Sequence, residues 1–98
     1  MSGAERFRNY PNQGNRAINA AVNGKPQAAI RHRNAMVNNI VQNANAVSPG
    51  QVNNAARFAR NVDDKLAKIL RILQGNLIMK PKTFTFKANN NRNNNVRN

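Results

Sequence analysis

Basic side chains recur at helical spacing in the stretch from Ser48 to Gly75. At about 100° per residue, four of them fall within one narrow sector of a helix, and Lys65 flanks that sector. The four are Arg57, Arg60, Lys68 and Arg71. Asp64 lies among them and can pair with Arg60 and Lys68 at i,i+4 spacing. Such a row either is a solvated face or binds phosphates, and this helix alone does not decide between the two.

The same stretch contains the signals that would position this face. Ser48 is a good N-cap, Pro49 suits the first helical position, and Gln51 completes a capping box. Gly75 is the residue type that commonly follows a helix C-terminus. The apolar residues between these signals recur on the side opposite the bases, and they are Val52, Ala55, Ala59, Val62, Leu66, Ile69, Leu70 and Leu73. The pattern predicts a helix over 49–74.

The charge of the whole chain favours the phosphate interpretation. Sixteen Lys and Arg against three acids give a formal charge of +13 over 98 residues. Bases occur from Arg6 to Arg97, so a single solvated tail does not explain them. Charge of this size and spread favours a polyanionic partner. The candidate nucleic-acid contacts are Arg6, Arg8, Arg16, Arg31, Arg33, Arg57, Arg60, Lys65, Lys68, Arg71, Arg92 and Arg97.

The residue types that catalysis needs are scarce. The chain has one His, three acids and no Cys, and its sequence contains no Gly-rich phosphate loop, metal-ligand cluster or catalytic triad. His32 stands between two arginines and is predicted to be a surface cation. Asp63 and Asp64 would project about 100° apart on a helix, so ion pairs explain them better than a catalytic dyad does. We therefore expect no enzymatic activity, no cofactor and no metal.

The expected fold is mainly α, a helical hairpin or three-helix arrangement with helices near 13–23, 26–47 and 49–74. Together they form one helical domain over 13–75. Residues 1–12 are predicted to be a basic, extended N-terminal arm, because Pro11 disfavours an earlier helix. In the second helix Arg33 projects near the apolar face, where it should either extend to solvent or meet an anion.

The C-terminal part has a different pattern. Residues 76–88 are predicted to be extended, with a short strand near 82–87 where Phe alternates with Thr. Residues 89–98 form an Asn-rich, low-complexity tail. An isolated strand is not stable by itself. Phe84, Phe86 and the exposed-face residue Ile72 are therefore predicted to contact other subunits.

Location follows from what the sequence lacks. The first ten residues have no apolar core of a signal peptide, and no run approaches the roughly 18 apolar residues of a membrane span. We expect no secretion through a signal peptide and no membrane partner. A virion or an intracellular nucleoprotein assembly is the expected location.

These features favour a structural, non-enzymatic protein that coats nucleic acid, of the viral coat or nucleoprotein kind, and packs a genome in many copies. Its phosphate contacts would be independent of sequence, on DNA or RNA. A minor capsid or cement protein, or a ribosomal protein threading through a large assembly, is the alternative. A membrane-active amphipathic protein is less favoured, because the helices carry much Asn and no Trp. The thin apolar content and the repulsion between bases also predict that the free chain is not a stable monomer.

Overall fold

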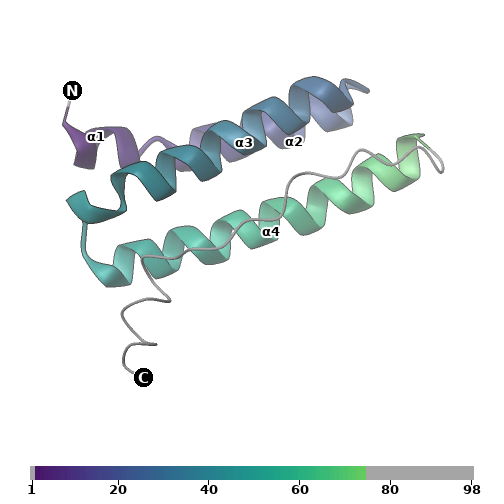
Figure 1. Cartoon of the computed structure of the whole chain (residues 1–98). Helices are drawn as coiled ribbons and strands as arrows, with labels where there is room; N and C mark the ends of the chain where they lie inside the picture. The colour runs from purple at the N-terminus through teal and green to yellow at the C-terminus, as the bar shows by residue number, and fades with distance from the viewer. Residues whose placement is uncertain (1, 75–98) are drawn as a thin grey trace.

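The computed structural model describes residues 2–74, which are mainly helical (Figure 1). α2 and α3 lie side by side, and α4 runs back along them after a sharp turn. This confirms the predicted mainly α class. The predicted strand near 82–87, the C-terminal tail and Gly75 lie outside the described residues. The elements are α1 (Gly3–Phe7), α2 (Tyr10–Val22), α3 (Pro26–Asn43), the 3-10 helix η1 (Ala44–Ala46) and α4 (Pro49–Gln74).

The range of α4 matches its prediction, and so does its capping box. The Ser48 hydroxyl accepts from the backbone N–H of Gln51 at 3.3 Å, and the Gln51 Oε1 accepts from the backbone N–H of Ser48 at 3.1 Å. Both bonds satisfy donors that an uncapped helix start would leave free. The buried face of α4 consists of Val52, Ala55, Ala56, Ala59, Val62, Leu66 and Leu70.

The N-terminal segment differs from the predicted extended arm. Ser2 and Glu5 form a capping box that starts α1, and α2 begins at Tyr10 rather than near residue 13. Pro11 is accepted because it lies in the first turn of α2, where a missing N–H leaves no helical bond unmade. Phe7 is 2 % exposed, so this segment is part of the core.

Aromatic contacts hold α1 in place. The ring of Phe7 packs edge to face on Tyr10, with centroids 5.3 Å apart, and Tyr10 packs the same way on Phe58 of α4 at 5.4 Å. Edge-to-face pairs at such distances add to the stabilisation from burial. The aromatics that alternate with arginines near the N-terminus are therefore core anchors.

The second helix is shorter than the predicted 26–47. α3 ends at Asn43, and the chain tightens into η1 before Val47 becomes extended, with φ −135° and ψ 171°. A 3-10 turn at a helix C-terminus is common because its i→i+3 bonds satisfy some of the last carbonyls. The turn into α4 is short, as the sequence predicts.

Small residues let α2 approach both of its neighbours closely. Gly14 is buried in α2. A Cβ placed there would lie 2.6 Å from Cε2 of Phe58, and 3.0 Å from both Sδ of Met36 and Cγ2 of Val62. Buried alanines from α2, α3 and α4 extend this thin core. The junction of the three helices thus needs the absence of a side chain at one position.

One ion pair joins α3 to α4. Nε and Nη2 of Arg33 donate to Oδ1 and Oδ2 of Asp63 at 2.8 and 2.9 Å, and Nη1 donates to Oδ1 of Asn34 at 2.8 Å. The Arg33 side chain is 3 % exposed and that of Asp63 is 24 % exposed. The anion that Arg33 meets is therefore internal. The prediction that Asp63 forms an ion pair is confirmed.

Substituting Gly14→Ala is expected to destabilise the fold. Overpacking a tight junction costs about 1–3 kcal/mol, which outweighs the gain of about 1 kcal/mol that alanine brings to a helix interior. Gly50→Ala is the matched control, because the nearest atom to its added Cβ would be Ser48 Oγ at 3.9 Å. Urea unfolding followed by circular dichroism measures both variants. Equal stability of the two would contradict the close approach.

Substituting Asp63→Asn is expected to lower the free energy of unfolding by about 3 kcal/mol, because the buried Arg33 charge loses its counter-charge. Asp64→Asn is the control. That neighbouring acid is exposed and has no ion pair within residues 2–74, so its change should stay within about 0.5 kcal/mol. The same unfolding assay applies, and similar effects of the two substitutions would show that the pair is not structural.

Candidate nucleic-acid interface

The outer face of α4 gathers five exposed bases, a set that we call the basic face. Its members are Arg57, Arg60, Lys65, Lys68 and Arg71. They project away from the buried side of the helix, and from the first to the last the face spans about 21 Å at 1.5 Å per residue. The structure therefore places five of the predicted site residues together on one rigid element.

Few acids offset this face. Asp63, one residue from Asp64, points inward to Arg33, so its charge is neutralised inside the fold. Asp64 is exposed on the basic face and has no ion pair with any residue of the described part. Asp64 therefore does not form the predicted pairs with Arg60 and Lys68 in the described part of the chain. The face remains strongly positive.

The other predicted bases are dispersed. Arg16 and Arg31 are exposed on α2 and α3, and Arg6 and Arg8 are exposed near the N-terminus. Lys25 is a further exposed base that was not predicted as a contact. Within residues 2–74, ten exposed bases stand against two exposed acids. The predicted contacts outside the described residues are Arg92 and Arg97.

Two predicted residues differ from the rest. Arg33 is buried, so it does not belong with the exposed contacts. Its position on α3 directs it toward α4, where the carboxylate of Asp63 compensates the cost of burying a charge. His32, predicted as a surface cation, is half-buried, because α3 turns it toward the side of Ala29 and Met36.

Exposed apolar side chains also lie on the described surface. Ile72, a predicted subunit contact, is 76 % exposed on α4. The other large ones are Val22, Val41 and Leu73. Phe84 and Phe86, the other predicted subunit contacts, lie outside the described residues.

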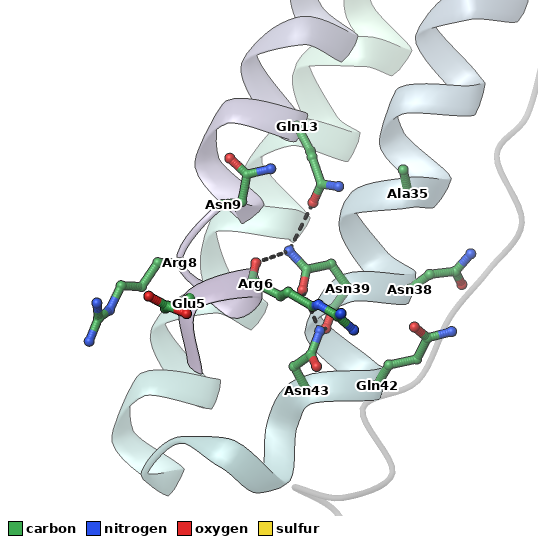
Figure 2. Close-up of a pocket in the computed structure, with 10 residues that line it drawn as sticks. All are labelled: Glu5, Arg6, Arg8, Asn9, Gln13, Ala35, Asn38, Asn39, Gln42 and Asn43. Atoms are coloured by element: carbon green, nitrogen blue, oxygen red, sulfur yellow. Dashed lines mark hydrogen bonds between the residues drawn. The ribbon is translucent and has the colours of Figure 1, made fainter. Parts of the chain in front are cut away.

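A groove of about 660 Å³ opens between α1, the start of α2 and the second half of α3 (Figure 2). The residues that line it are mostly amides and bases: Glu5, Arg6, Arg8, Asn9, Gln13, Ala35, Asn38, Asn39, Gln42 and Asn43. Figure 2 shows Arg6 extending across the groove toward Asn39 and Asn43, whereas Arg8 points away from it. The groove is thus polar, with positive charge at its edge.

Asn39 is the centre of the hydrogen bonds in this groove. It is 9 % exposed, and its Nδ2 donates to the carbonyl oxygen of Arg6 at 2.7 Å and to Oε1 of Gln13 at 3.0 Å. Nδ2 of Asn43 donates to the carbonyl oxygen of Asn39 at 3.0 Å and to its Oδ1 at 2.7 Å. These bonds satisfy the buried amide and join α1, α2 and α3.

Glu5 is the acidic residue of the groove. The pKa of its carboxyl group lies below the usual value, chiefly because the backbone N–H of Ser2 donates to Oε1 at 2.9 Å. The Ser2 hydroxyl and the positive charge of Arg8 lower the pKa further. Glu5 is therefore ionised at neutral pH and engaged in starting α1.

The sequence predicted the individual bases but not this groove. Its residues come from two segments about thirty positions apart, and the sequence predicts an extended arm where the structure has α1. The sequence does contain one indication of the groove. Asn38 and Asn39 are followed four positions later by Gln42 and Asn43, which are also amides. Residues at i,i+4 share a helix face, so these amides had to lie together.

Within residues 2–74, no cluster of three or more His, Cys, Asp or Glu side chains is arranged to hold a metal ion. No helix there combines the length and the apolar character that crossing a membrane requires. Comparison with protein-family models, with curated proteins and with solved structures gave no match.

Proposed function

We propose that this chain is a structural, non-enzymatic protein that coats nucleic acid in many copies, as a viral coat protein or nucleoprotein does, in a virion or an intracellular nucleoprotein assembly. The basic face of α4 is the observation that carries this proposal. Five long cationic side chains reach solvent from one helix whose opposite side is anchored in the core. Such an array neutralises phosphates and releases their counterions.

The chemistry of the basic face favours contacts to the backbone of a nucleic acid. Arginine binds phosphate bidentately, and Arg57, Arg60 and Arg71 supply three such groups, while the lysines add point charges. Contacts to phosphate position a protein but carry no sequence information directly. Packing of a whole genome requires this kind of indifference to sequence.

Exposed apolar residues support association between copies. Ile72 and Leu73 are 76 % and 50 % exposed at the end of α4, and Val22 is 56 % exposed at the end of α2. Apolar area that one copy leaves in water stabilises an assembly when a neighbour covers it. A genome-packing protein needs such contacts in addition to its charges, because each copy is small.

The first prediction from this proposal concerns salt. Because phosphate contacts release counterions, engagement of about six phosphates should weaken binding about a thousandfold between about 50 and 200 mM salt. Fluorescence anisotropy on two oligonucleotides of unrelated sequence measures it. Preference for one sequence, or affinity independent of salt, would contradict the proposal. Absence of binding would favour the minor capsid or cement alternative.

A second prediction assigns the contacts to α4. Substituting Arg57, Lys68 and Arg71 with Gln should reduce the slope of log affinity against log salt on duplex DNA by between about 2 and 3, because each lost contact removes about 0.9. Helicity should stay nearly unchanged, since these residues are exposed.

The matched control removes the same charge elsewhere. Substituting Arg16, Lys25 and Arg31 with Gln changes three exposed bases on or beside α2 and α3. We expect this variant to lose much less of the salt slope. If both variants lose the same amount, the net charge of the chain, rather than the basic face, determines binding.

A further inference from the structure

The outer side of α2 and α3 carries exposed bases of its own. In α2, the buried Gly14 faces Phe58 and Val62 of α4. Arg16 follows two positions later, so at about 100° per residue it projects about 160° away from Gly14. Arg16 is exposed, and it therefore reaches solvent on the side of α2 opposite to α4.

The geometry of α3 is the same. The side chain of Arg33 reaches Asp63 of α4 at 2.8 Å, and the exposed Arg31 stands two positions earlier. Arg31 therefore projects about 160° away from Arg33. Because α2 and α3 lie side by side (Figure 1), Arg16 and Arg31 share one surface, and Lys25 is exposed in the turn between the two helices. We call Arg16, Lys25 and Arg31 the rear bases.

No acid of α2 or α3 offsets the rear bases. The sequence has no Asp or Glu between Glu5 and Asp63, a span that includes both helices. Exposed neighbours of the rear bases include amides such as Asn12, Asn19 and Gln27. Amide side chains, like basic ones, contact phosphate and sugar oxygens in complexes with nucleic acid. The rear surface therefore offers the same kinds of contact as the basic face of α4, with fewer charges.

We propose that one copy of this chain binds two segments of double-stranded nucleic acid at once, one on the basic face and one on the rear bases. The inference rests on the proposed function and specifies how the chain packs a genome, since each copy then links two segments. The two surfaces differ in strength, because five bases form the basic face and three form the rear surface. The first segment therefore binds at α4, and the rear bases recruit the second.

A single duplex cannot occupy both surfaces. Duplex DNA has a persistence length of about 50 nm, so a short segment stays nearly straight and does not turn around a small helical bundle. The layer of α2 and α3 and the layer of α4 lie between the two surfaces, and each layer is about 10 Å across. This separation leaves room for one duplex on either side. The rear bases thus remain available after the basic face is filled.

The test mixes the full chain with two short duplexes of the same sequence, one labelled with a fluorescence donor and the other with an acceptor. If one copy links two duplexes, energy transfer should rise as protein is added. It should then fall, because excess copies occupy each duplex separately. With about three phosphates at the rear bases, association of the second duplex should weaken about fortyfold between about 50 and 200 mM salt. A rise to a plateau would show that contacts between copies join the duplexes, and it would overturn the inference.

Two variants assign the second contact. Substituting Arg16, Lys25 and Arg31 with Gln should abolish the energy transfer, whereas Arg16→Lys together with Arg31→Lys keeps the charge and should retain it. Circular dichroism checks that both variants keep their helices, and the titration of the unaltered chain decides the matter if the Gln variant does not fold. Energy transfer that persists in a folded Gln variant overturns the inference.

The same experiment separates this inference from the proposed function. A chain that binds single duplexes without any energy transfer overturns the link between two segments and leaves the proposed function standing. A chain that binds neither duplexes nor single strands contradicts both.

Discussion

The buried ion pair between Arg33 and Asp63 determines how charge is distributed over this fold. The chain has three acids for sixteen bases, and one acid is used inside, where it joins α3 to α4. A buried arginine is tolerated because the carboxylate and the amide of Asn34 satisfy its donors. Because this acid points inward, it does not reduce the charge of the outer face of α4. One interaction thereby supports both the packing of two helices and the electrostatics of the surface.

The core around this pair is thin, and its composition explains why. Alanines and one glycine occupy many of the buried positions of α2, α3 and α4, and the larger buried side chains include Phe7, Met36 and Ile40. Small residues let backbones approach closely but bury little apolar area each. The helices therefore depend on close fit as much as on buried area, and at Gly14 the fit leaves no room for a methyl group. Charge repulsion across the surface opposes the same core, so a polyanion that reduces the repulsion would also stabilise the fold.

The features of the fold that could be predicted from the sequence are those that local residue patterns determine. The helix over 49–74 and its capping box follow from spacing and residue type, and so does the expectation that Asp63 forms an ion pair, whereas its partner Arg33, thirty positions away, was not predicted. The prediction of an extended N-terminal arm was wrong. It rested on Pro11 as a residue that prevents a helix, but proline is accepted in the first turn of a helix, where Pro11 lies. The groove depends on long-range contacts, since Asn39 meets Arg6 and Gln13 across a fold whose first helix had not been predicted. Periodicity within α3 indicates that its amides share one face, but it does not indicate which residues of α1 and α2 meet that face.

The abundance of asparagine acquires a physical explanation at this junction. Asparagine is a mediocre helix former, so its cost within α3 must be offset by tertiary contacts. Asn39 provides those contacts by donating to the carbonyl oxygen of Arg6 and to Gln13, and Asn43 donates to Asn39 within α3, while Asn38 and Gln42 remain exposed one position away. An aliphatic residue at position 39 would remove the donor that binds both the carbonyl oxygen of Arg6 and Oε1 of Gln13, so the hydrogen bonds that join α3 to α1 and α2 would be lost. The amides of Asn39 and Asn43 therefore have a structural role, because Asn39 holds α1 against α3 and Asn43 fixes the orientation of Asn39.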